Sequence, residues 1–141
     1  MSLINNIFAH FYDGYKLSKS DIVKYTGVPY HNIRNRVINP HQEGKLCTFY
    51  YDIELIHSLL RNTEYTETSQ WFFSKLSENI PYSPADFYLR EGIQSVIDII
   101  ITSDINNYIE QHYPQYIKKH SEFSSSNKGF SLTMNYNQFS A

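Results

Sequence analysis

The segment between positions 30 and 36 is rich in side chains that can read the edges of base pairs in a nucleic-acid duplex. An arginine can form two parallel hydrogen bonds to guanine, and an asparagine can form two to adenine. The residues concerned are Tyr30, His31, Asn32, Arg34, Asn35 and Arg36. If the segment is helical, we expect most of them to lie outward, with Tyr30, His31, Asn32 and Arg34 facing bases.

Residues around this segment could also hold the phosphate backbone. Phosphate contacts fix the register of a protein on a duplex, and they commonly use hydroxyl groups and cations. The residues of these types that we expect to bind phosphates are Ser18, Lys19, Lys45 and Arg36.

Motifs that would build a catalytic or metal site within one segment are absent. The sequence has no glycine-rich phosphate loop, no His-Glu-x-x-His and no Cys-x-x-Cys. Its six histidines are scattered, and its single cysteine, Cys47, has no neighbouring group that would activate it. We therefore predict that the protein is not an enzyme and uses no cofactor and no metal.

Residues 18 to 38 contain the start and turn signals of two short helices. Ser18 and Asp21 have the spacing of a capping box at the start of the first helix. Gly27 permits the positive φ of a sharp turn, and Pro29 suits the first turn of the second helix. The polar segment from position 30 therefore falls on the second helix.

The second helix needs a buried side opposite its polar residues. Val28 can fill the angle between the two helices. Ile33 and Val37 are four residues apart, so we expect both to point inward.

Residues 21 to 33, Asp-Ile-Val-Lys-Tyr-Thr-Gly-Val-Pro-Tyr-His-Asn-Ile, resemble the helix-turn-helix of bacterial and phage DNA-binding regulators. The Xre and MerR/excisionase types are both similar. The resemblance implies that the second helix enters the major groove, and that the protein binds its operator as a two-fold dimer. Arg36 departs from the pattern, because these families usually keep an apolar residue there. The alternative is an ordinary helical hairpin, since three-residue turns with glycine are common between helices.

The segments that flank this pair of helices should support it. Residues 2 to 12 place Ile4, Ile7, Phe8 and Phe11 at helical spacing. A two-helix unit cannot bury a core alone, so we expect a helix here to pack behind the pair.

Residues 39 to 51 allow two interpretations. A glycine-containing turn followed by the strand-prone residues 46 to 51 is typical of the hairpin wing of a winged helix. The Xre-like alternative is a loop. We favour a mostly helical head and keep a short β-hairpin as the alternative. Residues 52 to 61 then predict a helix with Asp52 at its start and Arg61 near its end.

An apolar stripe dominates the second half of the chain. The polar residues 62 to 69 are the expected boundary. Ser83 is expected to cap a helix that opens at Pro84 and continues as one long helix, or as two with a break at residues 102 to 104. Its stripe consists of Ile93, Val96, Ile97, Ile100, Ile101 and Ile105. This stripe is either ordinary core or a seam that contacts a second protomer or another partner.

A second resemblance covers residues 71 to 101. Trp71-Phe-Phe, Leu76, Pro84-Ala-Asp-Phe, Glu91-Gly92 and the pair Val96-Ile97 are similar to the toxin-binding region of Xre/MbcA/ParS-type antitoxins. These proteins also place a helix-turn-helix first. The resemblance implies a toxin as the partner of this half.

Composition sets the remaining limits. The chain has 141 residues, of which 41% are hydrophobic, so it can bury a core. No apolar run approaches the ~20 residues of a membrane span, no signal peptide is visible, and Cys47 cannot form an internal disulfide. The net charge of −2 divides into +2 for residues 1 to 62 and −4 for residues 63 to 141. This division suits a DNA-binding head joined to a region with another task.

Together these patterns predict a mostly α protein in three parts. Residues 1–62 would form a helix-turn-helix head, residues 63–120 a helical dimerisation or partner region, and residues 121–141 a flexible tail or terminal strand. We predict a cytoplasmic, sequence-specific transcriptional regulator, a dimeric autorepressor from a phage, a mobile element or a toxin–antitoxin pair. The alternative is a protein-binding module, an antitoxin or small inhibitor, that acts through the acidic, aromatic-rich second half.

Overall fold

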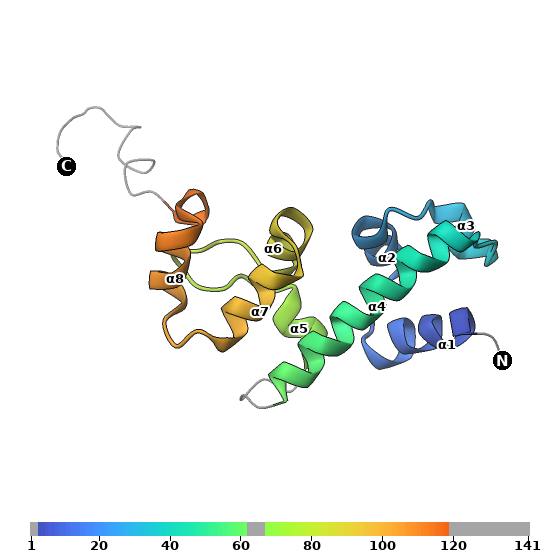
Figure 1. The fold of residues 1–141 in the computed structure, drawn as a ribbon, viewed down its shortest axis with the longest axis horizontal. Helices are drawn as coiled ribbons and strands as arrows, with labels where there is room; N and C mark the ends of the chain where they lie inside the picture. Colours follow the sequence, from blue (N-terminus) through green and yellow to red (C-terminus); the bar gives the residue numbers. More distant parts are fainter. Residues whose placement is uncertain (1–2, 62–66, 119–141) are drawn as a thin grey trace. The chain divides into compact units, whose positions relative to one another are not determined.

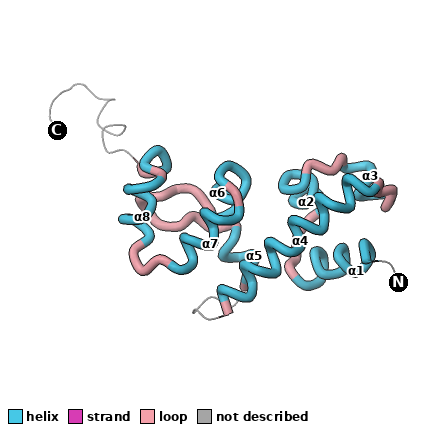
Figure 2. The backbone as a smooth tube through the Cα atoms, in the orientation of Figure 1, coloured by secondary structure: helices cyan, strands magenta, loops and turns pink. Residues whose placement is uncertain are grey.

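The computed structural model describes residues 3–61 and 67–118. Every regular element in these ranges is a helix, and their one β-type pairing is an isolated bridge between Ser77 and Ile80 (Figure 2). The prediction of a mostly α protein is therefore confirmed. In the part of the chain that is described, none of the helices is long and apolar enough to cross a membrane.

The described residues fall into two compact units. The first contains residues up to 75 together with 82–103, and the second contains residues 76–81 together with those from 104 onward. Helices on either side of the expected boundary at 62–69, α4 (Pro40–Leu60) and α5 (Thr68–Phe72), pack against each other within the first unit. The tail or strand expected at 121–141 lies outside the described residues.

The supporting helix expected near the N-terminus is present as α1 (Leu3–Ala9), which continues into a π-helical turn, η1 (His10–Gly14). Its inward residues Ile7, Phe8 and Phe11 are at most 1% exposed. α1 lies along α4 (Figure 1).

Two short helices, α2 (Lys19–Thr26) and α3 (Tyr30–Asn35), are joined by three residues. The predicted capping box is present: Ser18 Oγ accepts from the Asp21 backbone N–H at 3.1 Å, and Asp21 Oδ2 accepts from the Ser18 N–H at 2.9 Å. Gly27 has a φ of 77°. Val28 is fully buried.

The prediction for Val37 is wrong, because its side chain is 65% exposed. α3 ends at Asn35, since Arg36 adopts a left-handed backbone conformation with φ of 57°. The Asn32 side-chain amide donates to the Val37 carbonyl at 2.9 Å, which satisfies that carbonyl outside the helix. Ile33 does point inward and is fully buried.

Residues 40–60 form the single helix α4. The alternatives for residues 39–51 were a loop and a β-hairpin, and the helix predicted to follow them begins at Asp52. A second capping box starts α4: Asn39 Oδ1 accepts from the Gln42 N–H at 2.8 Å, and Gln42 Oε1 accepts from the Asn39 N–H at 3.0 Å. Pro40 fits the first helical turn. Buried residues then recur at helical spacing: Leu46, Phe49, Ile53, Ile56 and Leu60. This helical burial outweighs the strand propensity of the aromatic run.

The long helix predicted from Pro84 is divided into α6 (Pro84–Glu91) and α7 (Ile93–Ile101). The predicted cap is present, since Ser83 Oγ accepts from the Asp86 N–H at 3.2 Å. The break lies at Gly92, whose φ of 94° and ψ of 175° favour glycine. A second break falls within residues 102–104, as predicted for the two-helix alternative.

The second unit contains α8 (Ile105–His112), a short 3-10 helix, η2 (Pro114–Tyr116), and residues 76–81. The Lys118 backbone N–H donates to the Asn79 carbonyl at 2.8 Å, and Ser77 Oγ donates to Asn106 Oδ1 at 3.1 Å. These bonds tie the two segments of the unit together.

The core of the first unit forms around α4, which packs against α1, α2, α5 and α7 (Figure 1). Aromatic residues fill much of it, and the fully buried ones are Phe8, Phe11, Phe49, Phe72 and Phe87. The rings of Phe11 and Phe49 lie 5.4 Å apart and join the N-terminal helix to α4.

Candidate nucleic-acid interface

The outward side of α3 carries four of the predicted DNA-binding residues. Tyr30 is 50% exposed, and His31, Arg34 and Asn35 are exposed as well. Within the described ranges, the side chains of His31, Arg34 and Asn35 have no hydrogen bond or ring contact with the rest of the chain. They can therefore meet a partner without breaking any of these internal contacts.

Two other predicted residues, Asn32 and Arg36, are used within the protein. Asn32 closes the end of α3 through its bond to the Val37 carbonyl. The Arg36 guanidinium lies 4.2 Å from the centroid of the Phe8 ring, and its Nη1 donates to Asn5 Oδ1 at 2.8 Å. Arg36 therefore holds the end of α3 against α1.

Three of the predicted residues gather around Tyr12. The Lys19 ammonium lies 5.2 Å from the centroid of the Tyr12 ring, which stacks on Phe8 at 5.8 Å. Burial raises the pKa of Tyr12, the nearby Arg36 lowers it, and Tyr30 raises it. The start of α2 and the end of α3 thus both contact the stacked rings of Phe8 and Tyr12, an arrangement that sequence reasoning did not identify.

The start of α2 is suited to an anion. Ser18 and Lys19 are exposed there, and the first turn of a helix carries partial positive charge. The Ser18 hydroxyl accepts from the Asp21 N–H as part of the cap, so it remains a donor available to a phosphate.

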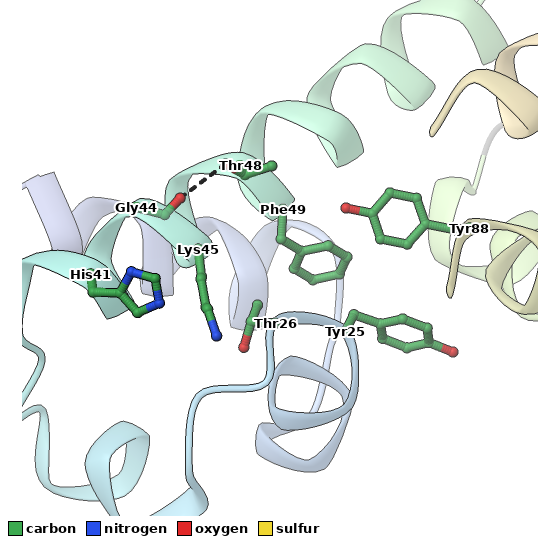
Figure 3. Close-up of a pocket in the computed structure, with 8 residues that line it drawn as sticks. All are labelled: Tyr25, Thr26, His41, Gly44, Lys45, Thr48, Phe49 and Tyr88. Atoms are coloured by element: carbon green, nitrogen blue, oxygen red, sulfur yellow. Dashed lines mark hydrogen bonds between the residues drawn. The ribbon is translucent and has the colours of Figure 1, made fainter. Parts of the chain in front are cut away.

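Lys45 reaches the turn between α2 and α3 from α4. Its Nζ lies 3.8 Å from the position that a Cβ on Gly27 would occupy. His41, one helical turn earlier, lines the same cleft beside Lys45, whose ammonium lies next to Thr26 (Figure 3). Sequence reasoning missed His41 because its pairing with Lys45 is visible only when residues 40–60 are helical.

The predicted apolar stripe does not form one seam. Val96 is fully buried in the core of the first unit, whereas Ile93, Ile97 and Ile100 are partly buried. Ile101 is 67% exposed. Ile105 begins α8 and belongs to the second unit. The reasons are that α7 packs against α4, which buries Val96, and that the break at residues 102–104 separates Ile105 from the other five.

Comparison with protein-family models gives no match, and comparisons with curated proteins and with solved structures give no significant match. Function is therefore inferred from the residues and their geometry.

Proposed function

We propose that the protein is a sequence-specific DNA-binding regulator of transcription in which α2 and α3 act as a helix-turn-helix. α3 would lie in the major groove. The observation that carries the proposal is the outward side of α3, where the exposed side chains of His31, Arg34 and Asn35 make no hydrogen bond, ion pair or ring contact within the described residues. The tight turn at Gly27 and the buried Val28 support it, because they fix the angle between the helices.

Each residue has a distinct role in this proposal. Base edges would be contacted by Tyr30, His31, Arg34 and Asn35. Phosphates would be held by Ser18, Lys19 and Lys45. Asn32 and Arg36 would position α3, since both are hydrogen-bonded within the protein. Within the proposed head, residues 40–60 form α4 in place of the alternative β-hairpin wing.

We also propose that the regulator acts in the cytoplasm as a homodimer that represses its own gene, as in phages, mobile elements and toxin–antitoxin pairs. A two-fold dimer would place two copies of α3 on half-sites about one helical turn of DNA apart, roughly 34 Å. Its operator would then be close to palindromic.

Fluorescence anisotropy with labelled duplexes tests the proposal. The set includes the region upstream of the gene and is titrated at two salt concentrations with unlabelled competitor DNA. We expect tight binding to the upstream region that survives competitor and weakens as salt rises. Absence of binding even at low salt would leave α2 and α3 as an ordinary helical hairpin.

Exposed apolar side chains favour a second candidate function, the binding of a protein partner. Phe73, Leu89 and Ile101 are 39%, 48% and 67% exposed. Such residues suit an antitoxin or inhibitor surface. Co-expression with the product of the adjacent gene distinguishes the candidates: a stable complex supports an antitoxin, and its absence favours a plain repressor.

A further inference from the structure

A cleft of about 420 Å³ lies within the first unit, between the end of α2, the first half of α4 and α6 (Figure 3). It is lined by Tyr25, Thr26, His41, Gly44, Lys45, Thr48, Phe49 and Tyr88. Small-molecule sites typically enclose roughly 300–1,000 Å³, so the cleft is large enough for a compact organic ligand.

The two sides of the cleft differ in chemistry. Lys45 and His41 lie on one side, and within the described residues the Lys45 ammonium has no hydrogen bond and no ion pair. Aromatic rings form the other side. Tyr25 stacks on Phe49 at 5.7 Å with an interplanar angle of 15°, and Tyr88 lies 5.8 Å from Phe49. A ligand that satisfies both sides carries a negative charge and a flat apolar ring.

Nearby polar groups are mostly satisfied. The Tyr88 hydroxyl donates to Asp52 at 2.6 Å, so this carboxylate has a partner. Thr48 Oγ donates to the Gly44 carbonyl at 3.0 Å. Thr26 Oγ donates to the Ile22 carbonyl at 2.5 Å and accepts from the Val28 N–H at 3.2 Å. Lys45 and His41 are therefore the side chains that remain for a ligand.

Gly44 keeps one wall of the cleft open. It lies inside α4, where glycine is less favourable than alanine because it has more backbone freedom to lose. A Cβ at this position would meet no atom within 4 Å, so neither packing nor backbone conformation within the described chain requires glycine. Space for a ligand beside α4 explains why glycine occupies position 44.

We infer that the cleft binds a small aromatic carboxylate, whose carboxylate pairs with Lys45 and whose ring lies against Tyr25 and Tyr88, the two aromatic residues of its lining that are partly exposed. His41 supplies a second hydrogen-bond donor. The site adjoins the α2–α3 turn through Thr26 and Lys45. If the proposed function holds, an occupied cleft also changes DNA affinity, because a ligand that contacts this turn favours one arrangement of α3. Ligand binding itself does not depend on that function.

NMR titration of the ¹⁵N-labelled full chain, without DNA, tests the site. The probes are benzoate, benzamide, which keeps the ring but not the charge, and acetate, which keeps the charge but not the ring. We expect benzoate to cause saturable shifts of amides in residues 25–28 and 41–49, with affinity roughly tenfold above that of either other probe. Equal affinity for benzamide, shifts confined to other residues, or no saturable shift would overturn the inference.

Two variants and one control sharpen the test. Lys45→Gln should weaken benzoate binding by roughly tenfold, and Arg61→Gln, which removes an equal charge at the far end of α4, should leave it unchanged. Gly44→Leu should abolish binding by filling the cleft, with α4 intact because leucine favours a helix. Amide dispersion reports whether each variant is folded. A folded Gly44→Leu protein that binds benzoate like the wild type contradicts the site.

Discussion

Arg36 combines a strained backbone with two side-chain contacts. Its φ of 57° is costly for any residue with a Cβ, by roughly 1–2 kcal/mol. The stacking of its guanidinium on Phe8 and its hydrogen bond to Asn5 offset part of that cost. The side chain therefore stabilises the end of α3, and its charge alone does not identify it as a phosphate ligand.

Substitutions at Arg36 separate these two effects. Arg36→Ala should lower the free energy of unfolding by about 1 kcal/mol, because the contacts are lost and the strain remains. Arg36→Gly loses the same contacts but relieves the strain, so it should be more stable than Arg36→Ala by about 1 kcal/mol. Urea denaturation measures both values. An alanine variant as stable as the glycine variant would contradict the left-handed conformation.

Three tyrosines, one buried and two partly buried, predict a loss of stability in alkali. Burial raises the pKa of Tyr25 to about 12, from a usual value of 10.0. Burial, aided by hydrogen bonds to Glu54 and Asp52, raises the pKa of Tyr15 and Tyr88 as well. The folded chain keeps these protons where the unfolded chain loses them. Their stabilising contribution is complete below pH 10 and is lost as the pH rises from there toward the folded pKa.

Tyr88→Phe should therefore reduce the steepness with which the free energy of unfolding falls above about pH 10. At neutral pH the same variant should be less stable by about 1 kcal/mol, because the bond to Asp52 is lost. Urea denaturation at several pH values gives both quantities. Tyr51→Phe is the matched control, since Tyr51 is 60% exposed and should keep the wild-type slope. Identical slopes for all three proteins would argue against the Tyr88 contribution.

Helix boundaries depend on local signals. The boundaries whose signals lie within a few residues of each other were predicted from the sequence. The capping boxes at Ser18 and Ser83 and the turn at Gly27 involve residues at most three apart, so their spacing is readable. The start of α4 at Asn39 uses the same device. It was missed because the β-prone residues 46–51 suggested a strand, and only burial against several helices decides between the two.

Two glycines, Gly44 inside α4 and Gly92 between α6 and α7, predict opposite effects on stability. Gly44→Ala should raise the free energy of unfolding by roughly 0.5–1 kcal/mol, since the backbone is helical and the added Cβ meets no atom. Gly92→Ala should lower it by at least about 1 kcal/mol, because its φ of 94° strains a residue with a side chain. Chemical denaturation of both variants checks the pair, and changes of equal sign would contradict the break between α6 and α7.

Most contacts between residues far apart in the chain could not be predicted from the sequence. Arg36 contacts Phe8 across 28 positions of the chain, and Lys45 reaches the turn at Gly27 only because α4 passes beside α2. Such contacts follow from tertiary packing, which no local pattern encodes. Tertiary packing also explains why residues 93–105 do not form a single exposed seam, because the side chain of Val96 is buried in the core. The outward side of α3 was predictable because one short helix determines it.

Measurement of the oligomeric state tests whether the exposed end of α7, at Ile101, contacts a second protomer. Ile101→Asp should leave the fold intact, because Ile101 is 67% exposed, and it should weaken the proposed homodimer if α7 forms part of it. Val96→Asp should unfold the protein, because a charge would be buried in the core. Sedimentation equilibrium and circular dichroism report the two outcomes. A dimer that is unaffected by Ile101→Asp would exclude the exposed end of α7 from the interface.

The base preference of Arg34→Ala tests most directly whether α3 reads DNA. Anisotropy gives the affinity of the wild type and the variant for the cognate duplex and for its single-base-pair variants. We predict a loss of ~1–3 kcal/mol on the cognate duplex and relaxed preference at one base pair. Lys19→Ala should weaken all duplexes about equally, and Arg61→Ala, an exposed arginine at the end of α4, should change nothing. If Arg34→Ala binds every duplex as the wild type does, α3 is not the reading helix.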